Sequence, residues 1–183
     1  MKLKASGWLT RSMALNLSLE AWEAGVSRLP IWRITFYKWD SFTVLREKNC
    51  SPEDFSNNAT LNGTPIRVSS ATDLTGGIVG VGYSPRVKPD DFLQVFSKLL
   101  QRGGMFYREG SGALTLCYVA SGSLIGYVEQ HINSWDCLGA LAIIEAAGGK
   151  TNDFLANDGL WKGNRLIAGP EALYPTLESF FEC

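Results

Sequence analysis

The spacing of apolar residues along the chain changes near residue 78. Before that point, residues 15–21 (LNLSLEA) carry apolar side chains at every odd position, which predicts a half-buried strand. Residues 29–37 (LPIWRITFY) and 42–45 predict two further strands, and the turn residues between them favour an antiparallel meander. Further predictions in this part are a loop at 47–60, a turn at Asn62-Gly63 and a short strand at 65–68.

After residue 78, buried strands alternate with helices. Residues 78–83 (IVGVGY) form a continuous apolar run, which is typical of a buried strand. Residues 89–102 carry apolar side chains at i, i+3, i+4, i+7 and i+8, which predicts a helix that ends at Gly103-Gly104. The remaining predictions are strands at 105–107, 123–128 and 165–168 and helices at 111–120, 134–147 and 171–181.

This alternation predicts a layered α/β unit. We expect two parts: residues 1–74 as an antiparallel-sheet subdomain, and residues 75–183 as an α/β subdomain.

The composition is that of an ordinary globular chain of 183 residues, with 45% hydrophobic and 19% charged residues. A formal net charge of −1 gives no support for a nucleic-acid partner. No apolar stretch approaches the roughly 20 residues that cross a bilayer, so we expect no membrane partner. The four cysteines form no CxxC pair, and we expect Cys117 and Cys137 to be buried thiols in a reducing cytoplasm.

Two carboxylates are candidates for chemistry. Asp136 falls in the first turn of the helix predicted at 134–147, where the helix dipole favours a negative charge even without a ligand. Glu129 follows the strand predicted at 123–128, and strand ends of this kind are where α/β sheets place ligands. A solvated loop glutamate is an equal alternative for Glu129.

Three other residues have both an ordinary and a functional explanation. Ser111, between two glycines at a predicted helix start, is an N-cap or part of an anion site built from free backbone N–H groups. His131 is the single histidine, and without a second histidine or a nucleophile elbow we expect a packed loop residue and no triad. Trp135 is expected to be a packing anchor.

The run from 108 to 149 resembles the inositol monophosphatase family. The matching pieces are a helix start at Gly110–Ala113, a Tyr-x-Glu strand end at 127–129, and a helix that runs from Trp135-Asp136 to Gly148-Gly149. The resemblance extends to segments at 18–26, 59–74 and 166–170, and so covers most of the chain from about residue 15.

The resemblance implies a layered α/β sandwich and a magnesium-dependent, lithium-sensitive phosphomonoesterase that forms a homodimer. It implies that Asp136 is a Mg²⁺ ligand that also reaches a substrate hydroxyl. Glu129 would bind another hydroxyl, and Ser111 and Gly112 would line the pocket of a small phosphorylated polyol such as inositol 1-phosphate. The divalent ion would activate water and neutralise charge on the leaving oxygen.

The family's main metal motif, Asp-Pro-x-Asp-Gly-Thr, and the Glu-Glu pair before it do not occur in this sequence. We therefore expect an N-terminally truncated member that lacks the first helices, part of the first sheet and most metal ligands, and we assign no catalytic residue. Gly112 also stands where the family usually has alanine.

Two functions remain open. The first is an impaired phosphatase, and the second is a non-catalytic relative that acts by binding or assembly. A nucleotide-binding module is disfavoured because the chain lacks both GxGxxG and GxxxxGK[ST].

Overall fold

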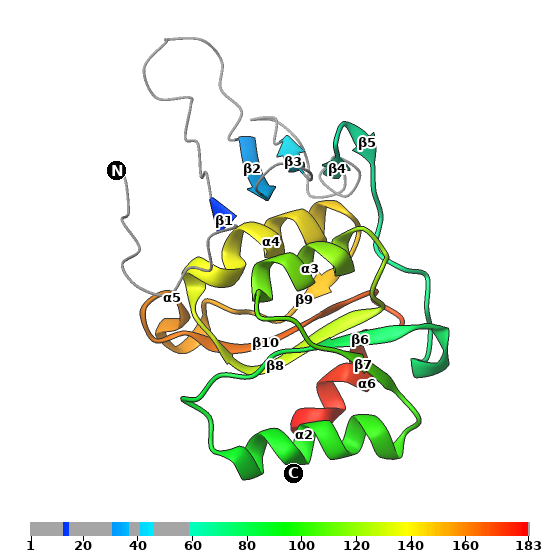
Figure 1. Ribbon diagram of the computed structural model, residues 1–183, viewed down its shortest axis with the longest axis vertical. Coiled ribbons are helices and arrows are strands. Elements are labelled where there is room, and N and C mark those ends of the chain that lie inside the picture. Colours follow the sequence, from blue (N-terminus) through cyan, green and yellow to red (C-terminus); the bar gives the residue numbers. More distant parts are fainter. Residues whose placement is uncertain (1–12, 15–30, 37–40, 46–58, 183) are drawn as a thin grey trace.

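The computed structural model describes residues 13–14, 31–36, 41–45 and 59–182. Within them, two five-stranded sheets enclose helices α3 (Gly112–Ala120) and α4 (Ser134–Ala146). Helices α2 (Pro89–Gln101) and α6 (Tyr174–Glu178) cover the other face of the second sheet (Figure 1). This arrangement confirms the predicted layered α/β sandwich. The strand predicted at 15–21 lies outside the described residues.

The first sheet is an antiparallel meander. Its strands pair in chain order: β1 (Met13–Ala14), β2 (Ile31–Phe36), β3 (Ser41–Leu45), β4 (Ala59–Leu61) and β5 (Thr64–Pro65). The strands predicted at 29–37 and 42–45 are confirmed.

The loop predicted through residue 60 is wrong at its end, and the strand predicted at 65–68 ends at Pro65. Asn62 and Gly63 both have positive φ, at 52° and 81°, as a two-residue hairpin turn requires. Such a turn pairs the residues on either side of it, so Thr60 lies opposite Pro65 in the ladder.

The second sheet is mixed, with the order β7-β6-β8-β10-β9. Strand β6 (Ile78–Val81) runs parallel to both β7 (Met105–Tyr107) and β8 (Gly126–Ile132). The other two strands, β10 (Asn164–Gly169) and β9 (Lys150–Thr151), run antiparallel to their neighbours, and β9 was not predicted.

The strand predicted at 123–128 is present, but it lies further along the chain than predicted. Strand β8 begins at Gly126 and continues to Ile132 because β10 pairs with it as far as Asn164 opposite Ile132. That pairing is between segments far apart in the sequence, so local periodicity does not reveal it. Glu129 and His131 therefore lie within strand β8 and not after it.

Three of the four predicted helices are confirmed almost to the residue: α2, α3 and α4. The helix predicted at 171–181 begins only at Tyr174, and its last residues form a 3₁₀ turn at Ser179–Phe181. Three short helical elements were not predicted: Leu74–Gly76, Ala156–Asp158 and α5 (Gly159–Lys162).

The two faces of the second sheet each have a hydrophobic core. One lies between this sheet and α3 and α4 and includes both Cys117 and Cys137, which are buried free thiols as predicted. The other lies beneath α2 and α6 and includes Val128 and Leu177. Trp135 is 56% exposed, so its prediction as a packing anchor is wrong. Among the described residues no helix has the length and apolar character needed to cross a membrane.

Candidate functional site

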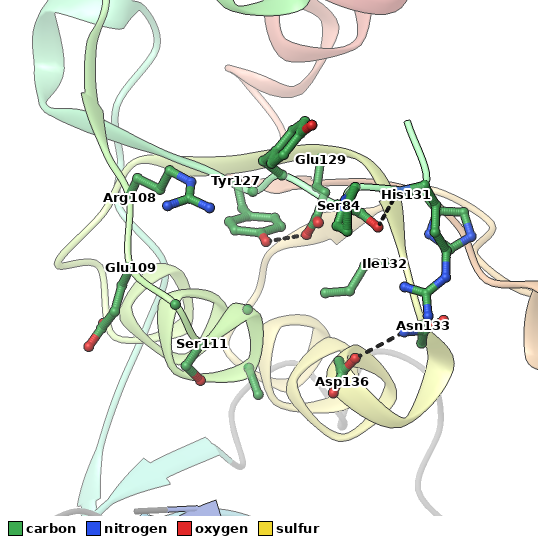
Figure 2. A pocket seen from close by; sticks show the side chains of 17 residues that line it. Ser84, Arg108, Glu109, Ser111, Tyr127, Glu129, His131, Ile132, Asn133 and Asp136 are labelled. Atoms are coloured by element: carbon green, nitrogen blue, oxygen red, sulfur yellow. Dashed lines mark hydrogen bonds between the residues drawn. The ribbon is translucent and has the colours of Figure 1, made fainter. Parts of the chain in front are cut away.

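A cleft of about 420 Å³ opens where β6 and β7 end and where α3 and α4 begin (Figure 2). All four residues predicted for the site line this cleft: Ser111, Gly112, Glu129 and Asp136. Because β6 and β7 are parallel, their carboxyl ends meet at one edge of the sheet, which is where open α/β sheets bind ligands. The fold therefore brings the candidates together, and their roles stay predictions.

One side of the cleft, here called the strand wall, consists of Gly82, Tyr127 and Glu129. Tyr127 and Glu129 are two positions apart in β8 and so project from the same face of the sheet. The Tyr127 hydroxyl donates a hydrogen bond of 2.5 Å to Glu129 Oε2 (Figure 2). Both side chains are buried, with Tyr127 1% and Glu129 6% exposed.

Burial has a large effect on the charge of Glu129. It removes water from the carboxylate and raises the pKa of Glu129 to about 7, and the nearby Asp136 acts in the same direction. The Tyr127 hydrogen bond and the positive charge of Arg108 oppose this rise in pKa. Glu129 is therefore not a solvated loop glutamate but a buried, oriented acceptor that changes charge near neutral pH.

Gly82 makes room for this hydrogen-bonded pair. Its backbone N–H continues the pairing of β6 with β8 by donating to Val128 O at 3.0 Å. A Cβ atom on Gly82 would lie 2.2 Å from Glu129 Oε2 and 2.3 Å from the Tyr127 hydroxyl oxygen. No side chain fits there, so glycine is required if Glu129 is to face the cleft.

The opposite side, here called the helix wall, consists of the first turns of α3 and α4, with Ser111, Gly112 and Asp136. Ser111 is the N-cap of α3, and its Oγ accepts a hydrogen bond from Leu114 N at 3.2 Å. The ordinary reading of Ser111 is thus confirmed, while its place beside the cleft leaves the anion-binding reading open. A Cβ atom at Gly112 would meet Ile132 Cδ1 at 2.7 Å.

Asp136 lies in the first turn of α4, as predicted, and is half-buried. Burial raises the pKa of its carboxyl group, while the hydrogen bond that Asn133 Nδ2 donates to Oδ2 at 3.3 Å and the charge of Arg86 lower it. Asp136 thus keeps one side toward the cleft and is less enclosed than Glu129.

His131 lies in β8 and not in a loop. Its Nε2 donates to Lys162 O at 2.9 Å, which ties the strand to α5. Its Nδ1 is enclosed and has no hydrogen-bond partner among the described residues. His131 is a packed residue, as predicted, and its neighbours in the described chain form no triad with it.

The cleft residues that sequence reasoning missed include Gly82, Arg86 and Arg108. The strand predicted at 78–83 ends at Val81, so Gly82 and Arg86 come after β6, and Arg108 directly follows β7. The signal that could have found them is the rule that ligands bind at the carboxyl ends of parallel strands.

The resemblance implies Mg²⁺, whose usual ligands are carboxylate oxygens, water and substrate phosphate. Asp136 fits as one such ligand, because its carboxylate is only half-buried and lines the cleft. Glu129 is already hydrogen-bonded to Tyr127. Among the described residues there is no group of three or more His, Cys, Asp or Glu side chains placed to hold a metal ion. These residues therefore do not by themselves form a complete magnesium site.

Comparison with known proteins assigns the family. The model of the inositol monophosphatase family matches residues 53–180, which is most of the chain, so the chain belongs to that family. Among curated proteins, Nus factor SuhB of Haemophilus influenzae is 36% identical over 115 residues, covering 61% of this chain and 43% of that protein. Nus factor SuhB of Escherichia coli K12 is 33% identical over 113 residues, covering 61% of this chain and 42% of that protein.

Solved structures agree with the family. The extragenic suppressor protein suhB from Bartonella henselae superimposes with a TM-score of 0.64 and 26% identity, covering 78% of this chain and 52% of that one. The inositol monophosphatase from Anabaena gives a TM-score of 0.64 and 25% identity, covering 81% of this chain and 57% of that one. The chain spans less than half the length of these curated relatives.

Proposed function

We propose that the cleft is the substrate-recognition part of an inositol monophosphatase-type site, which takes a small phosphorylated polyol such as inositol 1-phosphate. The observation that supports this most is the pairing of two carboxylates, Glu129 and Asp136, on opposite walls of one cleft beside the start of α3. The family match supports the same substrate class.

The chemistry of each wall suits a polyol. Carboxylate oxygens accept hydrogen bonds from hydroxyl groups, and acceptors with a fixed orientation distinguish ligands that carry the matching hydroxyls. Glu129 is held by Tyr127 before any ligand arrives, so little ordering is needed on binding. Ser111 and Gly112 would contact the ligand from the other side.

Hydrolysis by this chain would need a divalent ion in the cleft. When bound, Mg²⁺ would supply an activated water and neutralise the leaving oxygen, and Asp136 would be one of its ligands. Because the described residues offer no complete set of ligands, we expect slow turnover. Lithium sensitivity, a homodimer and a cytoplasmic location are further expectations from the resemblance, and exposed strand β7 is a surface that a second copy would cover.

Phosphate release from inositol 1-phosphate by the 183-residue chain, with and without Mg²⁺, tests this proposal. We expect slow, Mg²⁺-dependent release that Asp136→Asn reduces at least about tenfold, the loss expected when a charged hydrogen-bonding or ligating group is removed. The matched control is Asp90→Asn, which removes a carboxylate from the first turn of α2, away from the cleft, and should leave the rate unchanged.

The names of the relatives favour a second candidate, a non-catalytic role in assembly. Several curated relatives carry the name Nus factor, so we also consider that this chain acts by binding a partner. The net charge of −1 gives no electrostatic support for a nucleic-acid partner. A folded chain that binds inositol 1-phosphate but releases no phosphate with Mg²⁺ would favour this candidate over the phosphatase.

A further inference from the structure

Two arginines stand at the carboxyl edge of the parallel strands. Arg86 lies in the loop after β6, and Arg108 directly follows β7. Because β6 and β7 are parallel neighbours, both side chains reach the same cleft, and both line it. Figure 2 shows Arg108 directed toward Tyr127 and Glu129, whereas its neighbour Glu109 points away. The cleft thus has two guanidinium groups that the polyol hydroxyls do not require.

Neither guanidinium has a partner within the described residues. No hydrogen bond or ion pair joins the side chain of Arg86 or Arg108 to another described residue, and both arginines are exposed. Each still acts on a carboxylate at longer range, since Arg108 lowers the pKa of Glu129 and Arg86 lowers that of Asp136. The N–H donors of both side chains line the cleft and are open to a ligand.

The first turn of α3 adds a third source of positive potential. Gly112 and Ala113 line the cleft, and in the first turn of a helix the backbone N–H groups have no acceptor within the helix. The helix dipole places partial positive charge at the same end. An anion between the arginines and this turn would meet N–H donors from both sides.

We propose that Arg86, Arg108 and the first turn of α3 hold the phosphate of a polyol monophosphate, so that this chain binds its ligand without a divalent cation. This inference rests on the proposed function, because Glu129 and Asp136 keep their place at the ligand's hydroxyls. The new element is the set of groups that hold the phosphate: two arginines and a helix start take the place of a metal ion. The planar guanidinium fork matches phosphate oxygens in pairs, and these charge-assisted hydrogen bonds are the strong ones.

Calorimetric binding in EDTA tests the proposal with three probes: inositol 1-phosphate, myo-inositol and inorganic phosphate. Inositol 1-phosphate should bind more tightly than myo-inositol, which has only the hydroxyl contacts, and more tightly than inorganic phosphate, which has only the phosphate contacts. Arg86→Gln and Arg108→Gln should each weaken its binding by about tenfold or more, the loss typical of a charge-assisted hydrogen bond. Arg86→Lys keeps the charge but loses the fork, so its loss should be intermediate.

The control variant is Lys88→Gln, which removes the same charge from the same loop at an exposed position that does not line the cleft. Its binding should equal that of the unmodified chain. If inositol 1-phosphate binds only with Mg²⁺, or if both arginine variants bind it normally, the arginine proposal is wrong while the proposed function stands. If it binds under no condition, the proposed function itself fails.

Discussion

The two walls of the cleft hold their carboxylates in different ways. On the strand wall, Glu129 is held by Tyr127, which belongs to the hydrophobic core. The backbone of Gly82 packs so closely against both side chains that a Cβ atom would overlap them. On the helix wall, Asp136 depends on a helix start and one hydrogen bond from Asn133, and it remains half-buried. The strand wall is therefore rigid and sensitive to the pH, and the helix wall is more open and adjustable.

This difference separates recognition from chemistry. A buried carboxylate with a raised pKa is costly to ionise and unsuited to relaxing around an ion, but it is well placed to select hydroxyl groups. A half-buried carboxylate at the start of a helix can exchange water for a metal or ligand at smaller cost. Substitutions on one wall leave the residues of the other wall unchanged, so the two roles can be tested separately.

The largest expected effect comes from filling the space at Gly82. In Gly82→Ala the new Cβ would overlap both Glu129 Oε2 and the Tyr127 hydroxyl, so their hydrogen bond must break or the sheet must shift. Overpacking together with loss of a charged hydrogen bond predicts a decrease of about 4 kcal/mol in the free energy of unfolding. Chemical denaturation measures it.

The control for this substitution is Gly110→Ala, because a Cβ at Gly110 has nothing within 4 Å and its φ is not positive. Gly110→Ala should change the stability by less than about 0.5 kcal/mol, as surface substitutions usually do. Equal stability of the two variants would show that the strand wall is not rigid.

The second effect is the pH dependence that Glu129 gives to stability. Its pKa in the folded chain is about 7, above the ordinary value of 4.5, so the folded state holds this proton over a pH range in which the unfolded state has lost it. The contribution of Glu129 to stability is therefore greatest below about pH 4.5 and is lost as the pH rises to about 7. Glu129→Gln removes this dependence.

We expect Glu129→Gln to gain about 2 to 3 kcal/mol of stability relative to the unmodified chain between pH 5 and pH 8, by the linkage of pKa to stability. Denaturation at both values measures the gain. Glu109→Gln, at an exposed position of the same cleft, is the matched control for the exchange of a carboxylate for an amide. A constant difference between Glu129→Gln and the unmodified chain would mean that Glu129 is solvated.

Both carboxylates of the cleft were found from the sequence, but the strand that carries Glu129 and the arginines beside it were not fully predictable. Ser111 and Asp136 are found by local rules, because caps and first-turn acids depend only on neighbours within four residues. The reach of β8 to Ile132 depends on pairing with Asn164, and the meeting of Arg86 and Arg108 depends on the parallel pairing of β6 with β7. Both are long-range contacts that leave no periodic signal near the residues concerned.

The smallest effect concerns Gly112, where the family usually has alanine. In Gly112→Ala the new Cβ would overlap only Ile132 Cδ1, the end of a side chain that can rotate. The higher helix propensity of alanine, worth up to about 1 kcal/mol, offsets the cost of that rotation, so stability should change by less than about 0.5 kcal/mol.

A double-mutant cycle with Ile132→Val, which removes the overlapping methyl group, tests whether Ile132 limits the space at Gly112. Ile132→Val alone should cost about 0.5 to 1.5 kcal/mol as a core truncation. Alanine at 112 should be more favourable beside valine than beside isoleucine, with a coupling of about 0.5 to 1 kcal/mol, because the contact is direct. Denaturation of the four proteins gives the coupling. Strict additivity would mean that Ile132 does not limit the space at Gly112. A measured coupling would mean that the absence of a side chain at Gly112 leaves room for the Ile132 side chain beside the cleft, although the fold tolerates glycine or alanine at position 112.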